Sequence, residues 1–67
     1  MTAMTAEEAI EIISDYHQNN PDLRYDAFAN GNMTFDVKVI SLSLMEQGGS
    51  GNVGMYIVTQ SGGFWLK

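Results

Sequence analysis

A change in the spacing of apolar residues at Pro21 constrains the fold of this chain more than any other feature of its sequence. After the proline, apolar and polar residues alternate, which is the pattern of a strand with one buried face. Before it, apolar residues recur at intervals of three and four, which at about 100° per residue gives one stripe of an α-helix. The stripe contains Ala6, Ala9, Ile10, Ile13, Tyr16 and His17, with Ile12 at its edge.

Capping residues mark both ends of this helix. Thr5 and Glu8 have the spacing of a capping box, in which each side chain accepts a hydrogen bond from the backbone N–H of the other residue. Two asparagines before Pro21 tolerate the left-handed conformation that ends helices, and the proline disfavours helix in the residue before it. We therefore expect a helix over residues 6–18.

Three alternating segments follow, and we expect strands over residues 22–29, 33–45 and 53–66. The last segment contains a Ser-Gly-Gly sequence at 61–63, where the chain can either turn back as a hairpin or bulge within one long strand. We favour three main strands, with a fourth if the chain turns there. The pattern leaves open whether Phe64 and Trp65 belong to the core or to a contact surface.

The connection between the first two strands decides which residues pair. A three-residue loop at 30–32 pairs Ala29 with Met33 and Leu23 with Val39, which keeps the apolar side chains on one face. Beyond Val39 the alternation changes phase. This change predicts a β-bulge near Val39 and Ile40.

Together these elements predict an α+β domain over residues 1–67, in which one N-terminal helix packs on a three-stranded or four-stranded antiparallel β-meander in two layers. A helix of 13 residues is about 20 Å long and covers only part of such a sheet. The opposite face is expected to stay partly open around Phe28 and one or more of Tyr56, Val58 and Trp65.

Charge is distributed unevenly along the chain. The formal net charge is −5, and the first 23 residues carry all of this surplus, with five acids and no Lys or Arg. In the remaining 44 residues, three bases balance three acids. Binding to nucleic-acid phosphates or to an anionic membrane requires clustered cations, which three scattered bases do not supply. We therefore expect no direct binding to nucleic acid or to a membrane.

Composition also bears on the compartment. The chain has no cysteine, no apolar run near 18 residues and no basic segment before an apolar stretch. These features point away from disulfides, a membrane span and a signal peptide. We expect a cytoplasmic protein, located in the cytosol of the bacterial host if a phage encodes it.

No catalytic or cofactor motif is predicted. The spacing G-x-G-x-x-G occurs at 49–54, but a nucleotide-binding loop needs a strand before it and a helix after it, whereas we expect a mobile glycine-rich loop over 46–54 followed by a strand. His17 is the only histidine and is expected to pack at the end of the helix. The carboxylates of Glu11 and Asp15 make at best a weak, solvent-exposed pair of ligands for calcium or magnesium. We therefore expect no enzyme, cofactor or metal site.

Four carboxylates of the helix fall within an arc of about 100° opposite the apolar stripe. Spaced three and four residues apart, they repel one another, and each like-charged pair costs a helix about 0.2–0.5 kcal/mol. Asp15 also lies near the negative end of the helix dipole. A solvated surface usually mixes both signs of charge, so this arrangement favours binding to a basic partner. The predicted partner-binding residues are Glu7, Glu8, Glu11, Asp15 and Asp22.

The spacing of these carboxylates is similar to that of DNA phosphates. From Glu7 to Asp15 the helix rises about 12 Å, in three intervals that average about 4 Å. One DNA strand carries a charge about every 3.4 Å of its axis. A protein groove that accepts phosphates is therefore expected to accept this helix.

The layout of the whole chain resembles the small acidic phage-encoded anti-CRISPR proteins, some of which imitate DNA. MTAEEAIEIISDYHQ reads as an acidic N-terminal helix, and RYDAFANGNMTFDVKVISLSLM and VGMYIVTQSGGFWLK read as a meander. It looks most like a type I-C inhibitor of this layout. That resemblance implies binding to the large subunit of a CRISPR surveillance complex and exclusion of target DNA.

Two hypotheses follow. In the first, the chain is a non-enzymatic inhibitor, a monomer or weak homodimer, whose acidic helix binds a basic nucleic-acid-binding protein surface. In the second, it is a small oligomeric structural or assembly protein that self-associates through its open sheet face or an edge strand, with Phe28, Tyr56 and Trp65 as anchors.

Overall fold

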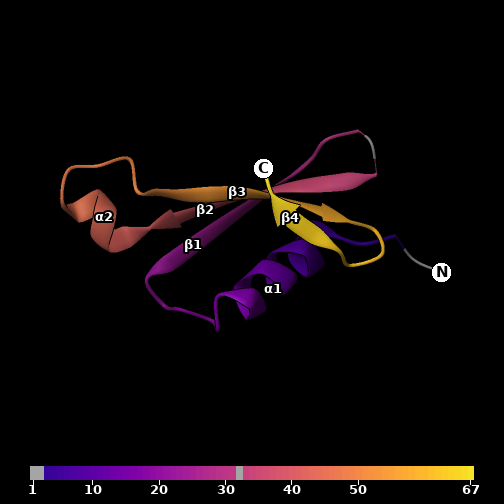
Figure 1. Cartoon of the computed structure of the whole chain (residues 1–67), viewed down its shortest axis with the longest axis horizontal. Helices are drawn as coiled ribbons and strands as arrows, with labels where there is room; N and C mark the ends of the chain where they lie inside the picture. The colour runs from indigo at the N-terminus through magenta and orange to yellow at the C-terminus, as the bar shows by residue number, and fades with distance from the viewer. Residues whose placement is uncertain (1–2, 32) are drawn as a thin grey trace.

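The computed structural model describes residues 3–31 and 33–67. Four strands form one antiparallel sheet in the order β1-β2-β3-β4, and the N-terminal helix packs on it against β1 and β2 (Figure 1). The predicted α+β fold, a helix on an antiparallel meander, is confirmed. The elements are α1 (Ala6–Tyr16), β1 (Leu23–Ala29), β2 (Thr34–Ser41), α2 (Leu42–Glu46), β3 (Asn52–Thr59) and β4 (Phe64–Leu66).

Helix α1 begins as its sequence predicts. The Glu8 N–H donates to the Thr5 hydroxyl at 3.2 Å, and the Thr5 N–H donates to the Glu8 carboxylate at 3.0 Å, which completes the capping box. The helix ends at Tyr16, two residues earlier than expected. Gln18 and Asn19 follow with φ of 59° and 55°, so the left-handed turn that ends the helix starts one residue before the asparagine pair.

The pairing of β1 with β2 differs from the predicted register by two residues. Ala29 lies opposite Phe35, and Leu23 lies opposite Ser41. The connection between the two strands is longer than expected. It is closed by a hydrogen bond from the Asn30 N–H to the Thr34 carbonyl at 3.2 Å, and Met33 within it takes a left-handed conformation with φ of 59°. A shift of two residues leaves every side chain on its predicted face, since the side-chain period of a strand is two.

A register shift occurs between Val39 and Ile40, at the level where the β-bulge is predicted. The predicted change of phase within this strand is wrong, because the extra residue is Val53 of β3, and β2 keeps its alternation through Ser41. The predicted continuation of this strand to residue 45 is wrong, because β2 ends at Ser41 and α2 follows. The Ser41 hydroxyl accepts a hydrogen bond from the Leu44 N–H at 3.3 Å and so caps the new helix. A short apolar run can form either the end of a strand or a helical turn. Here the Ser41 cap stabilises the helical turn.

Gly51, in the connection from α2 to β3, packs closely against Ser41 and Met45. Its carbonyl accepts a hydrogen bond from the Ser41 N–H at 2.7 Å, and its φ is +75°. A Cβ atom at this position would lie 2.3 Å from the Met45 Cγ and 2.8 Å from the Ser41 carbonyl oxygen. The glycine-rich connection therefore contains one position where the fold requires glycine.

The last two strands form a hairpin, so the sheet has four strands rather than the favoured three. The Gly62 N–H donates to the Thr59 carbonyl at 3.0 Å, and the Thr59 N–H donates to the Gly63 carbonyl at 2.8 Å. β4 then pairs with β3 through three residues. Phe64 packs against the core, whereas Trp65 points to the other face and is 52% exposed.

The core lies between α1 and the sheet. Tyr56 and Val58 belong to it, because they lie directly opposite core-facing residues of β2. The expectation that either residue lies on the open face is therefore wrong for both. Tyr16, which the helix stripe placed in the core, is 59% exposed. The buried apolar residues are Ala9, Ile13, Leu23, Val37, Val39, Tyr56 and Val58.

Candidate interaction surface

The surface of α1 that faces away from the sheet carries the predicted carboxylates. Glu7, Glu8, Glu11 and Asp15 are all exposed, whereas Ala9 and Ile13 of the same helix are fully buried. The 3.6-residue period thus separates an acidic face from a core face. The structure brings these four predicted site residues together, and we call them the acidic face.

No cation of the described chain pairs with the acidic face. Among residues 3–31 and 33–67, the only ion pair joins the Lys67 ammonium to the Asp36 carboxylate at 3.1 Å. Glu8 also accepts the capping hydrogen bond from the Thr5 N–H, which holds its carboxylate at the start of the helix. The like charges along α1 are therefore compensated only by solvent and, at the first turn, by the positive end of the helix dipole.

Asp22, the fifth predicted site residue, does not lie on α1. It follows Pro21 in the connection to β1, and its carboxylate accepts hydrogen bonds from the Ser41 hydroxyl, the Ser43 N–H at 2.9 Å and the Ser43 hydroxyl at 2.8 Å. The Ser41 and Ser43 hydrogen bonds hold the pKa of the Asp22 carboxyl below its ordinary value. Asp22 thus joins the α1–β1 connection to the start of α2.

The three bases of the chain lie away from the acidic face. Lys38 projects from the sheet face opposite α1, and the Lys67 ammonium pairs with Asp36 on that same face. Arg24 starts from the same face of β1, and its guanidinium donates to the carbonyls of Pro21 and Leu23, both at 2.9 Å. The acidic face therefore carries only negative charge, whereas the opposite sheet face carries both signs, with Asp26 and Asp36 beside the two lysines.

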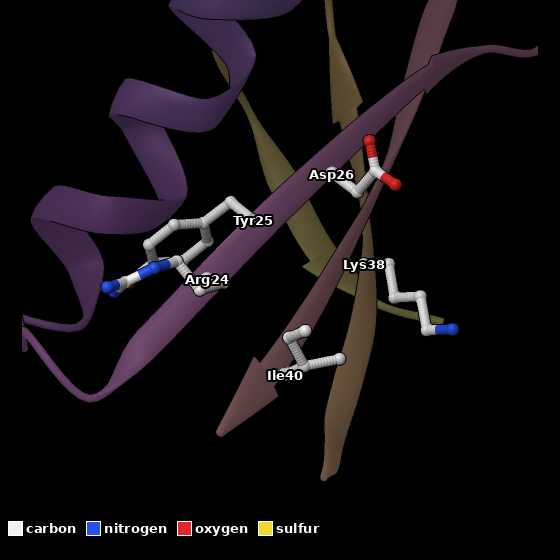
Figure 2. A pocket seen from close by; sticks show the side chains of 5 residues that line it. All are labelled: Arg24, Tyr25, Asp26, Lys38 and Ile40. Carbon is white, nitrogen blue, oxygen red and sulfur yellow. The ribbon is translucent and has the colours of Figure 1, made fainter. Parts of the chain in front are cut away.

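Sequence reasoning did not identify a cavity beside β1. It has a volume of about 200 Å³ and is lined by Arg24, Tyr25, Asp26, Lys38 and Ile40. Figure 2 shows the Tyr25 side chain turned toward α1, while Asp26, Lys38 and Ile40 lie on the other side of β1. The alternation of apolar and polar residues predicts which face of the sheet each of these side chains occupies. It does not predict the cavity, because the cavity depends on the length and conformation of each side chain.

An aromatic cluster lies at the end of α1. The His17 ring contacts Tyr16 and Tyr56, with ring centroids 5.2 and 5.6 Å apart, and lies 6.5 Å from Tyr25. The His17 Nε2 and the Tyr25 hydroxyl are buried and have no hydrogen-bond partner among the described residues. Edge-to-face contacts of this kind stabilise a small core by about 0.5–1.5 kcal/mol each. His17 therefore packs where the sequence predicts.

Within 3–31 and 33–67, no three His, Cys, Asp or Glu side chains converge in a way that could hold a metal ion. In the same part of the chain, no helix is long and apolar enough to cross a membrane.

Comparison of the chain with protein-family models, with curated proteins and with solved structures found no match.

Proposed function

We propose that this chain is a non-enzymatic inhibitor that lays its acidic face on a basic, nucleic-acid-binding protein surface. The partner we propose is the large subunit of a type I CRISPR surveillance complex, which makes the chain a phage anti-CRISPR protein that excludes target DNA. One observation carries the proposal: the four exposed carboxylates of α1 have no ion-pairing cation among the described residues.

The cost of this arrangement supports a binding role. Each like-charged pair at three or four residues destabilises a helix by about 0.2–0.5 kcal/mol, and a lysine in place of one acid would turn several of these pairs favourable. A partner with clustered Lys and Arg supplies the missing charge on binding. The carboxylates then contribute more than they do in water, because the contact excludes solvent.

The position of the three bases supports the same orientation. The face opposite α1 carries Lys38 and Lys67 together with Asp26 and Asp36, so its charges balance and a basic partner is attracted to the acidic face instead. Electrostatic steering of this kind raises the association rate and makes it fall as salt is added.

The test is a competition experiment. The purified chain is titrated into a type I-C surveillance complex bound to fluorescent target duplex, and release of the duplex is measured at two salt concentrations. We expect release by the wild-type chain, weaker at the higher salt concentration.

The decisive variant is Glu11→Lys, and Glu46→Lys is its matched control. Both residues are exposed helical glutamates, and both substitutions change the net charge by the same amount, but Glu46 lies on α2. We expect Glu11→Lys to weaken release at least about tenfold, as the reversal of a close interfacial charge does, and Glu46→Lys to act nearly as the wild type. Equal effects of both variants would show that net charge alone matters and would contradict the proposed site.

A further inference from the structure

The sheet face opposite α1, which we call the open face, bears two large exposed aromatic side chains. Phe28 is 49% exposed and Trp65 is 52% exposed. They lie in one row across the sheet, because Phe28 pairs with Asp36, Asp36 with Ile57, and Ile57 with Trp65. The row therefore begins and ends with an aromatic ring, one on each outer strand.

The next row of the open face begins and ends with opposite charges. Asp26 on β1 pairs with Lys38, and Lys38 pairs with Met55 on β3. Lys67 completes the row, since its N–H donates to the Met55 carbonyl at 2.7 Å. Asp26 thus lies at one edge of the sheet and Lys67 at the other.

We infer that a second copy of this chain packs on the open face, related by a two-fold axis that runs parallel to the strands between β2 and β3. Such an axis places each outer strand over the opposite outer strand of the second copy. Phe28 then meets Trp65 of the second copy. The Lys67 ammonium, which pairs with Asp36 at 3.1 Å in the single chain, exchanges this partner for Asp26 of the second copy. Each contact occurs twice, as two-fold symmetry requires.

The cavity beside β1 fits this arrangement. Its open-face walls are Asp26, Lys38 and Ile40 (Figure 2). The same axis lays β3 and β4 of the second copy over it, so that the Met55 and Lys67 side chains of that copy fill the hollow. A lysine stem packs on apolar atoms while its ammonium reaches a carboxylate, here that of Asp26.

The acidic faces do not oppose this dimer. Sheets packed face to face lie about 10 Å apart, and each α1 lies on the far side of its own sheet, so the two acidic faces are separated by more than a Debye length of about 8 Å at 0.15 M salt. The chain's negative surplus thus stays on the outside of the dimer. Each acidic face remains free to bind a partner, so the inference does not depend on the proposed function.

The size of the open face sets the expected affinity. The strands β1, β2, β3 and β4 have seven, eight, eight and three residues. At about 3.3 Å per residue and about 4.8 Å between strands, the face covers about 400 Å² on each copy. The total of about 800 Å² lies in the range of weak, transient interfaces, so we expect a weak dimer in the micromolar range or above.

Sedimentation equilibrium tests the inference. For the wild-type chain, we expect the average mass to rise from the monomer value of 7.4 kDa. The rise should approach twice that value between about 10 μM and 1 mM, the range of a weak interface. A chain that stays monomeric to the upper concentration overturns the inference.

Charge exchange identifies the contact. Asp26→Lys alone and Lys67→Asp alone should each weaken the dimer at least about tenfold, because each places like charges opposite one another twice. The double variant Asp26→Lys with Lys67→Asp should dimerise again. Within one copy, residues 26 and 67 lie on opposite edges of the sheet. Because Lys67 also pairs with Asp36 of its own copy, a variant in which Lys67→Asp is combined with Asp36→Lys serves as the background for the same exchange. Recovery of the dimer on adding Asp26→Lys reports contact between copies, and failure in both backgrounds contradicts the proposed pairing.

Two controls separate folding and function from association. Thermal unfolding of each variant shows whether the loss of dimer reflects a loss of the fold. Glu11→Lys, which tests the acidic face, should leave self-association unchanged, because α1 lies on the other side of the sheet. A Glu11→Lys variant that dimerises but does not release DNA separates the two sites, and a wild-type chain that releases DNA as a monomer overturns only the dimer.

Discussion

The Asp22 carboxylate accepts hydrogen bonds from both the backbone N–H and the hydroxyl of Ser43, at 2.9 and 2.8 Å, and so holds the first turn of α2 against the α1–β1 connection. A third hydrogen bond comes from the Ser41 hydroxyl, the same side chain that caps α2. The two connections at this end of the molecule are therefore fixed by one carboxylate.

We predict that Asp22 makes stability depend on acidity. Its pKa is lower in the folded chain than its ordinary value, so the folded state binds fewer protons than the unfolded state at low pH. The stabilisation is present above the unfolded pKa of about 3.9 and is lost as the pH falls through the folded value. Urea unfolding of wild type and Asp22→Asn from pH 6 to pH 2 measures it. We expect the difference in stability between the two proteins to shrink as the pH falls.

Gly51 and Gly62 form a matched pair of glycine positions. Both have a left-handed φ, of +75° and +92°, but only at Gly51 would a Cβ atom meet neighbouring atoms within 4 Å. Gly62→Ala should cost about 1–2 kcal/mol through the backbone alone. Gly51→Ala should cost clearly more, because a backbone oxygen cannot move aside as a flexible side chain does. Chemical denaturation of both variants checks the order, and equal costs would contradict the close approach at Gly51.

Asp15 should limit the stability of the free protein. It lies in the last turn of α1, near the negative end of the helix dipole, and follows Glu11 by four residues on the same face. Asp15→Asn should raise the unfolding free energy by about 0.3–1 kcal/mol. Thr5→Ala, which removes the helix cap, should lower it by about 0.5–2 kcal/mol in the same measurement. A neutral or destabilising Asp15→Asn would show that the acidic face carries no internal strain.

Local rules predict the parts of this fold whose partners are near in sequence. Thr5 and Glu8 are three residues apart, and their capping box forms as expected. The acidic face follows for the same reason, since a helix fixes the angular position of each side chain. Ser41 is different, because the carboxylate that it contacts belongs to Asp22, 19 residues earlier, and only the folded chain brings the two together.

The register of β1 and β2 shows a second limit. The shortest loop that keeps apolar residues on one face was expected, but any even shift preserves that face. The structure selects the longer loop, with Met33 in a left-handed conformation that few methionines adopt. The apolar pattern does not assign Tyr56 and Val58 to a face, for a related reason. Their face depends on the pairing of β3 with β2, which the apolar pattern of β3 does not determine.

Strand order in this sheet follows chain order, and each strand pairs only with its neighbours along the chain. Helix α1 likewise makes most of its contacts with the two strands that come next in sequence. Most loops that must close during folding are therefore short, and chains with such local contacts fold quickly. The hydrogen bond from the Met4 N–H to the Gln60 side chain, 56 residues away, closes a long loop, and we expect it to form late. Rapid folding suits a small chain that has no disulfide to hold it.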